Sequence, residues 1–238
     1  MSKAIILCSG GLDSVVNSYY IKNKLRYRDI IILFFNYSQK SLNSERKCSK
    51  KAARKLGAKF IEIKLDWLRS ISQSLINKEG KIKKISLKDL KDARKESSKY
   101  YVPCRNLIFI SHALALADSI YHKESKKSDI FLGFKCEGND SYPDTTKEFV
   151  KKVNELSKIS CLARSKIISP LIDMDKEDII ELGEKIGVNF NDTFSCYVSA
   201  DKHCGVCLAC RLRQEGFYWS NVKDPTKYRR KMRDFRSD

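Results

Sequence analysis

The 238-residue chain predicts an α/β fold, a doubly wound parallel sheet followed by a small C-terminal zinc-bound subdomain. Three observations lead to this prediction. Short apolar runs alternate with helical segments, which is typical of parallel strands covered on both faces. A pair of glycines, at positions 10 and 11, ends the first apolar run. Four of the nine cysteines gather near the C-terminus, at positions 196, 204, 207 and 210.

The elements follow from these alternating segments. Strands are expected at residues 3–9, 29–35, 58–65, 128–134 and 166–171. Helices are expected at residues 12–25, 44–56, 105–122, 145–157, 174–187 and 208–219. We expect Gly57 to end the second helix and Asp173 to be the N-cap of the fifth.

Residues 66–100 interrupt the alternation with a lysine-rich stretch that is poor in core residues, so we expect a mobile excursion or lid there. The chain then divides into an α/β domain at 1–190, which includes this excursion, a four-cysteine zinc-binding subdomain at 191–222 and a basic tail at 223–238.

Composition excludes a membrane-spanning protein, because no apolar run reaches the roughly 18 to 20 residues that a bilayer requires. There is no signal-peptide pattern, so a cytoplasmic location is expected. The net charge is +18, from 47 basic and 29 acidic residues. Such a charge favours association with phosphate-bearing partners. A lysine-rich surface that is simply solvated accounts for the same net charge equally well.

The glycine pair predicts an anion site. A strand that ends in Ser9-Gly10-Gly11 and leads into a helix places unpaired backbone N–H groups at the carboxyl edge of the sheet. Ser9 and Ser14 can add hydroxyl donors, and Asp13 can hold Mg²⁺ or orient the loop. For a bare glycine pair, a strand-to-helix turn without a ligand remains the alternative.

The cysteine cluster has the spacing C-x7-C-x2-C-x2-C, in which the C-x2-C hook brings two thiolates to one metal. Four thiolates complete a closed, structural zinc site. Buried cysteines without metal and an iron–sulfur cluster remain alternatives. His203 is expected either beside the ligands without binding the metal or exposed at the surface.

These motifs resemble known ones. The segment SGGLDS at 9–14 resembles the pyrophosphate loop of ATP pyrophosphatases, which split ATP into AMP and pyrophosphate. With further segments in the same order, the chain from about residue 3 to 220 resembles the 7-cyano-7-deazaguanine synthase family. The further segments are FNYSQ at 35–39, VPCRN at 102–106, YPD at 142–144, SPLIDMDKEDI at 169–179 and SCY…CGVCLAC at 195–210.

The resemblance implies an adenine nucleotide alpha hydrolase-like fold and a ligase reaction. ATP, with Mg²⁺, would adenylate the carboxylate of 7-carboxy-7-deazaguanine, and ammonia would displace AMP to give an amide. A second activation would convert the amide to the nitrile.

The resemblance also implies roles for individual residues. The catalytic candidates are Asp13, Ser14, Arg105 and Lys176. The ATP-binding candidates are Cys8, Ser9, Gly10, Gly11, Leu12, Asp13, Ser14, Tyr37 and Gln39. The substrate-binding candidates are Arg105, Asn106, Tyr142, Asp144, Phe194 and Tyr197, and the zinc ligands are Cys196, Cys204, Cys207 and Cys210.

Four of the catalytic and substrate-binding candidates also have an ordinary structural interpretation. Arg105 could be a surface salt-bridge partner, and Lys176 a solvated residue in the first turn of a helix. Asn106 could be a helix N-cap, and Tyr142-Pro143 a rigid turn.

The chain departs from the family pattern at its substrate loops. Asn36-Tyr37-Ser38-Gln39 stands where the family commonly has D-Y-G-Q, and Cys104 stands where a small residue is usual. The residues around YPD also differ, with EGNDS before it and Thr145-Thr146 after it.

These departures keep three hypotheses open. The first is the nitrile synthase. The second is a paralogue that conjugates a deazapurine acid to an amine of a protein or nucleic acid. The third is a tRNA-modifying or nucleic-acid-binding relative, supported by the charge, although the basic residues are diffuse and no aromatics are interleaved with them. A homodimer is compatible with all three.

Overall fold

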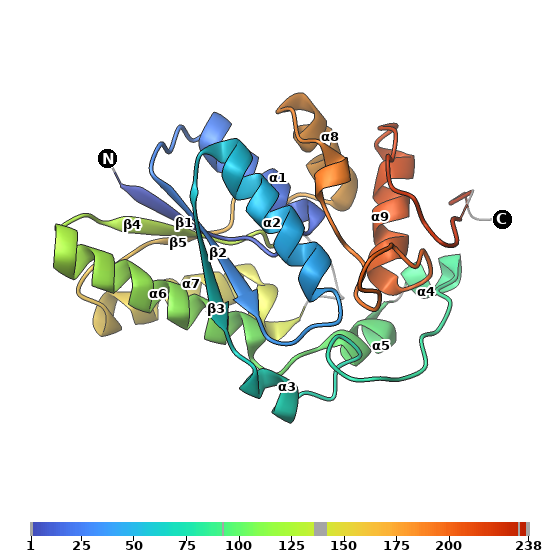
Figure 1. Cartoon of the computed structure of the whole chain (residues 1–238), viewed down its shortest axis with the longest axis horizontal. Coiled ribbons are helices and arrows are strands. Elements are labelled where there is room, and N and C mark those ends of the chain that lie inside the picture. The colour runs from blue at the N-terminus through green and yellow to red at the C-terminus, as the bar shows by residue number, and fades with distance from the viewer. Residues whose placement is uncertain (1, 92, 136–141, 233, 237–238) are drawn as a thin grey trace.

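Five parallel strands form the sheet of the computed structural model, which describes residues 2–91, 93–135, 142–232 and 234–236 (Figure 1). The strands are β1 (Lys3–Leu7), β2 (Ile30–Asn36), β3 (Lys59–Lys64), β4 (Ser128–Phe131) and β5 (Ile167–Ile168). Their order is β3-β2-β1-β4-β5, and every neighbouring pair is parallel. The chain therefore starts in the middle of the sheet and winds outward twice, which confirms the doubly wound prediction and puts the switch point between β1 and β4.

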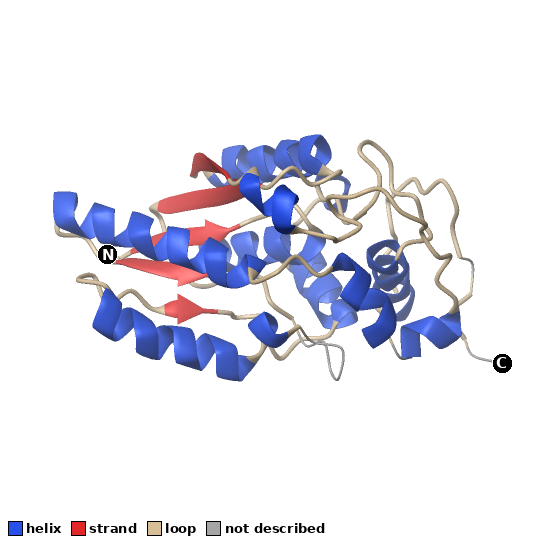
Figure 2. Ribbon diagram, turned by 90° about the horizontal axis from the view of Figure 1, so that it is seen from below, coloured by secondary structure: helices blue, strands red, loops and turns tan. Residues whose placement is uncertain are grey.

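Helices cover both faces of this sheet. The long helices are α1 (Leu12–Asn23), α2 (Leu42–Leu56), α6 (Arg105–Glu124), α7 (Lys147–Ser160), α8 (Lys176–Lys185) and α9 (Leu208–Trp219). All six lie where the periodicity predicts a helix. Figure 2 shows the strands pointing toward the loops and short helices at the end of the molecule where the C-terminus lies.

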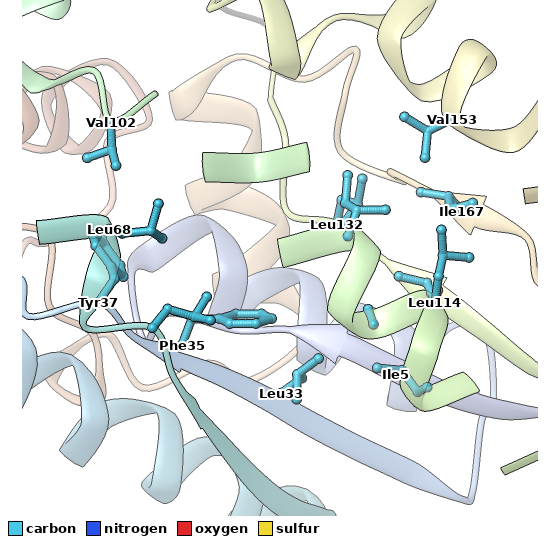
Figure 3. Close-up of a cluster of buried hydrophobic side chains, with 14 of the residues drawn as sticks. Ile5, Leu33, Phe35, Tyr37, Leu68, Val102, Leu114, Leu132, Val153 and Ile167 are labelled. Carbon is cyan, nitrogen blue, oxygen red and sulfur yellow. The ribbon is translucent and has the colours of Figure 1, made fainter. Parts of the chain in front are cut away.

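The hydrophobic core has two layers, one on each face of the sheet, because successive side chains of a strand point to opposite faces. Ile5 and Leu33 face α6 and α7 in the cluster of Figure 3, whereas Ile6 and Ile32 face α1, α2 and α8. Because consecutive strand residues point to opposite faces, a sheet covered on both sides needs unbroken apolar strands. All seven residues of β2 are buried, as this requires.

Two of the predicted helix caps can be compared with the structure. Gly57 ends α2 with a φ of +61°, as predicted. The predicted N-cap Asp173 is wrong, because Asp175 caps α8 and its backbone N–H donates to the Asp178 carboxylate at 3.2 Å. A capping box needs an acceptor three residues after the cap, and among the two aspartates only Asp175 has an acid there. Asp173 pairs with Lys147 instead.

The excursion at 66–100 contributes several side chains to the core, most of them from outside its lysine-rich stretch. It contains α3 (Trp67–Ile71), α4 (Leu87–Lys91), α5 (Arg94–Ser97) and a 3₁₀ turn at Ser98–Tyr100. Its Leu68, Ile76, Ile85 and Tyr100 are buried in the same cluster as β2. The expectation of few core residues concerned the lysine-rich stretch at 77–99, where the buried apolar residues are Ile85 and Ala93. Leu68, Ile76 and Tyr100 flank that stretch.

The basic tail is also packed against the rest of the chain. Tyr228 forms an isolated bridge with His203, and the Arg229 N–H donates to the His203 carbonyl at 2.9 Å. Further along, Phe235 is buried and its ring contacts that of Tyr218 on α9. None of the helices in the described part of the chain has the length and apolar composition that a bilayer crossing requires.

Candidate active site and metal centre

A cavity of about 290 Å³ opens where β1, β2 and β4 end, beside the switch point of the sheet. In open α/β sheets this is the place where ligands bind. The loop after β1, the N-termini of α6 and α8, and the segment Phe194–Tyr197 contribute to its wall. Most of the predicted ATP and substrate residues line it: Cys8, Ser9, Gly11, Leu12, Asp13, Ser14, Tyr37, Gln39, Arg105, Asn106, Tyr142, Lys176, Phe194 and Tyr197.

The loop after β1 has the geometry of an anion site. Gly11 caps α1, so the first N–H groups of this helix have no partner within it. Ser14 Oγ donates to the Gly11 carbonyl at 3.0 Å and lies 3.2 Å from Ser9 Oγ. Two hydroxyls and the positive end of a helix therefore meet at one point of the cavity wall.

Gly10 does not line the cavity but makes the loop possible. Its φ is +81°, and a Cβ at this position would lie 2.3 Å from the Glu45 carbonyl oxygen and 2.9 Å from the Ser49 nitrogen. Both atoms belong to the backbone of α2, so neither can move aside easily. Only glycine allows α2 to approach the loop this closely.

Asp13 and Lys176 form an ion pair in the cavity wall. The Lys176 Nζ lies 2.6 Å from both carboxylate oxygens of Asp13, and the two side chains are 16% and 25% exposed, with lysine first. Lys176 is the first residue of α8, but its charge is engaged in the cavity wall, so the interpretation as a solvated first-turn lysine is wrong. The pair gives the site one group that can bind a cation and one that can bind an anion.

A second cation, Arg105, also lines the cavity. Arg105 donates to the hydroxyl of Tyr37 at 3.2 Å, and its guanidinium lies 5.7 Å from the centre of the Tyr37 ring. Burial raises the pKa of Tyr37 to about 12, although Arg105 opposes this shift. Tyr37 is therefore neutral near pH 7 and available as a hydrogen-bond donor.

Glu45 is a cavity residue that sequence reasoning missed. It accepts hydrogen bonds from Ser41 Oγ at 2.5 Å and from Gln39 Nε2 at 2.9 Å. Gln39 Oε1 in turn accepts the Tyr37 N–H at 3.0 Å. Burial raises the pKa of Glu45 above its ordinary value, against the effect of these two hydrogen bonds. The one signal in the sequence is its position in the first turn of α2, where an acid is also common for helix stability.

The cavity wall contains other residues that the motifs did not indicate. Gly133, Phe134 and Lys135 follow β4 closely, and Phe109 lies on α6.

Asp144 lies outside the main cavity. Its carboxylate accepts hydrogen bonds from the backbone N–H and the side-chain amide of Asn106, at 3.1 and 3.2 Å. It thus satisfies a free N–H at the start of α6 and lines a smaller neighbouring hollow with Asn106 and Tyr142. Asn106 is not the N-cap of α6, because that position is Cys104.

Two of the residues that depart from the family pattern have a left-handed backbone conformation. Ser38 and Cys104 have φ values of +57° and +51°, a left-handed conformation that costs a side-chain-bearing residue about 1–2 kcal/mol. The Ser38 N–H donates to Asn36 Oδ1 at 3.2 Å, and its hydroxyl donates to Asp66 at 2.9 Å. Ser38, where the family commonly has glycine, therefore keeps a conformation that suits glycine.

The four clustered cysteines fit one metal ion. Their Sγ atoms all lie within 4.8 Å of one another, with 4.0 Å between Cys196 and Cys207 and 3.9 Å between Cys204 and Cys210. A tetrahedral thiolate site with metal–sulfur bonds of about 2.3 Å needs sulfur–sulfur distances of about 3.8 Å. The backbone N–H groups of Val206 and Cys207 also donate to the sulfur of Cys204, both at 3.4 Å.

His203 lies beside this cluster and is buried, so the interpretation as an exposed residue is wrong. Its Nε2 accepts the Ser195 N–H at 3.0 Å, and its ring contacts those of Phe194 and Tyr228. Cys136, one of the scattered cysteines, lies outside the described residues.

The sequence of the chain is similar to a known family of proteins over nearly its whole length. The family model for "Queuosine biosynthesis protein QueC" matches residues 3–221. The 7-cyano-7-deazaguanine synthase of Methanosphaera stadtmanae is 41% identical over 229 residues, which cover 95% of this chain and 98% of the relative. The synthase of Methanobrevibacter smithii is 34% identical over 229 residues, covering 95% and 97%. That of a Nitratiruptor species is 36% identical over 230 residues, covering 95% and 99%.

Replacing one thiolate tests the metal centre. Cys207 is fully buried, so Cys207→Ser is expected to remove the metal and destabilise the chain. A loss of a few kcal/mol lowers the melting temperature of a protein of this size by on the order of 10 °C. Metal content and thermal unfolding are the measurements, with Cys161→Ser, outside the cluster, as the control. Full metal content and an unchanged melting temperature in Cys207→Ser would refute the site.

Proposed function

The chain belongs to the QueC family of queuosine biosynthesis proteins, and from this premise we propose that it is an ATP-dependent 7-cyano-7-deazaguanine synthase. The observation that carries the proposal is the Asp13–Lys176 pair beside the free N-terminus of α1, in the cavity at the switch point. This arrangement suits a magnesium-bound triphosphate, since it combines a carboxylate, an ammonium and free backbone N–H groups.

The proposed first step is activation of a carboxylate. Oxygen of 7-carboxy-7-deazaguanine attacks the α-phosphorus of ATP, pyrophosphate leaves, and the acid becomes an acyl adenylate. The loop from Ser9 to Ser14 holds phosphate oxygens, Asp13 binds Mg²⁺, and Lys176 stabilises the negative charge that develops on phosphate. Activation is needed because the oxygen of a carboxylate is a very poor leaving group.

The later steps introduce nitrogen. Ammonia attacks the acyl carbon, AMP leaves with the bonding electrons, and a proton is lost to give the amide. The amide oxygen then attacks the α-phosphorus of a second ATP, and pyrophosphate leaves. Loss of that oxygen with AMP and of two N–H protons gives the nitrile. Arg105 is proposed to bind the carboxylate or phosphate together with Lys176, because both residues line the same cavity.

The deazapurine ring is proposed to lie among the aromatic residues of the cavity. Phe109 lies on α6 and Tyr37 directly follows β2, and their rings contact each other. Phe194 and Tyr197 lie on either side of Cys196, the first cysteine of the cluster. Aromatic faces can stack a planar base. Asp144 is the least suited of the candidate residues to bind the base, because its carboxylate already accepts from Asn106.

We propose zinc as the metal of the cysteine cluster. Four thiolates complete a tetrahedral site and leave no position for water, so the metal acts as a structural element. It would hold Cys196 and the neighbouring Phe194 and Tyr197 against the cavity, where both rings are wall residues.

A second candidate function differs in the acceptor. Thr145, one of the positions that depart from the family pattern, lines the cavity. A changed wall residue is compatible with an enzyme that transfers the activated acid to an amine of a protein or nucleic acid. In that case the product is an amide on a macromolecule and no nitrile forms.

Turnover distinguishes these functions. The purified chain, ATP, Mg²⁺, 7-carboxy-7-deazaguanine and ammonium are incubated together, and nucleotides and deazapurines are followed by mass spectrometry. We expect AMP, pyrophosphate and the nitrile, and no turnover in Asp13→Ala. ATP consumption without nitrile would favour the second candidate, and no ATP consumption at all would refute both.

Gly216→Ala tests the role of Lys176 without altering that residue. A Cβ at Gly216 on α9 would lie 2.3 Å from Lys176 Cγ, close to the backbone of the lysine, so its side chain has to shift. Alanine is intrinsically better than glycine in a helix by about 1 kcal/mol, so α9 itself is not weakened. We expect the rate of ATP consumption to fall by about tenfold or more, as for a charge contact worth roughly 1.5–3 kcal/mol.

The control for this variant is Gly183→Ala on α8. Its Cβ would meet Phe190 and Val16, at 2.8 Å each, rather than Lys176. An equal loss of activity in both variants would assign the effect to general overpacking and not to the position of the lysine.

A further inference from the structure

The excursion at 66–100 and the basic tail at 223–238 are far apart in the sequence, but both contact the loop at 203–206. This loop lies at the end of the molecule where the C-terminus is found and where α4 lies beside α9 (Figure 1). The N–H of Ile85, in the excursion, donates to the Val206 carbonyl at 3.1 Å. On the other side, the tail lies so close to Gly205 that a Cβ there would be 1.7 Å from the Arg230 carbonyl oxygen. The metal-binding loop at 203–206 therefore joins the excursion to the tail.

Eight exposed basic residues lie within three positions of these contacts or of the bridge between His203 and Tyr228. Two of them, Lys83 and Arg229, form ion pairs, and the other six together form what we term the basic face. They are Lys84, Lys88, Lys202, Lys227, Arg230 and Lys231. In the described parts of the chain, none of the six forms an ion pair. The nearby acids are already engaged, Asp89 with Lys83 and Asp201 with Arg229.

We propose that the basic face binds the phosphate backbone of a nucleic acid. Six like charges without counter-charges repel one another, and a polyanion relieves this repulsion and releases its own bound counterions. In the sequence the lysines look diffuse, but the fold concentrates two separate groups of them around one loop.

A protein partner fits this surface less well. Protein interfaces are built around an apolar, charge-depleted centre, whereas nucleic-acid interfaces are more polar and far more positive. Among the large hydrophobic side chains that the structure describes as exposed, Ile82 is the nearest in sequence to the basic face, and it is only 39% exposed.

The excursion also connects the basic face with the cavity. The same segment that carries Lys84 and Lys88 contributes Ile76 to the cavity wall, and its Ser97 carbonyl accepts the hydroxyl of Tyr142 at 2.7 Å. A nucleic acid on the basic face would therefore contact a segment that also shapes the proposed active site.

The experiment measures binding of one fluorescently labelled 20-nucleotide sequence, as single-stranded RNA and as DNA, by anisotropy at several salt concentrations. The full chain is used with its metal, since the tail packs on the metal-binding loop and cannot be deleted cleanly. We expect log Kd to rise linearly with log salt concentration. The triple variant Lys227→Gln, Arg230→Gln, Lys231→Gln is expected to bind at least about tenfold more weakly, with a salt slope reduced by about two.

The matched control removes three exposed lysines outside the basic face, from α6, from the turn before β4 and from α7, with the same change in net charge. These substitutions are Lys123→Gln, Lys127→Gln and Lys151→Gln. A second variant, Lys84→Gln with Lys88→Gln, tests the excursion independently if the tail variant loses metal or stability. Equal weakening by the control, binding that ignores salt, or equally tight binding of poly-glutamate would overturn the proposal. Weaker binding in the two variants of the basic face alone supports it.

Discussion

The contact between Asp13 and Lys176 joins the start of the chain to its C-terminal third, and the proposed active site depends on it. Asp13 lies in the first turn of α1, directly after the loop that follows β1, whereas Lys176 begins α8, which packs against α1. Helix α8 is held in turn by α9, where glycine at position 216 lets the two helices approach closely. A cavity for a charged ligand therefore forms only when both ends of the chain are folded together.

The cavity wall also depends on the folding of the cysteine cluster. Cys207 is the N-cap of helix α9, and Phe194 and Tyr197, which lie on either side of Cys196, line the cavity. Arg213, also on α9, is 1% exposed and donates to Thr193 Oγ1 at 2.7 Å and to the Phe190 carbonyl at 3.1 Å. Buried hydrogen bonds of this kind are costly to break. The cysteine cluster, α9 and the cavity wall thus form one connected unit, so the proposed structural metal would support a site that it does not enter.

Local patterns predicted most of the fold. The strands and long helices follow from apolar periodicity, and the geometry of the glycine loop and of the cysteine cluster follows from short motifs of a few residues. Contacts between distant segments were missed for a physical reason, because single apolar residues such as Ile85 and Phe235 carry no periodic signal. In the sequence, Glu45 cannot be distinguished from any other acid on a surface helix. It becomes a cavity residue only because α2 packs closely against the loop that contains Gly10. Asp144 could not be recognised as the partner of Asn106, because the two lie 38 residues apart and meet only through the fold.

The most direct test is calorimetric titration of Mg·ATP into the intact chain and into Lys176→Gln. Glutamine keeps part of the side-chain stem that packs on Gly216 and removes the charge. Lys185→Gln is the control, because Lys185 lies on the same helix but is exposed and paired with Glu181. We predict that Lys176→Gln binds about ten- to a hundredfold more weakly, as expected for loss of a charged hydrogen bond, while Lys185→Gln binds normally. Equal affinity in all three proteins would contradict the assignment of this cavity as the nucleotide site.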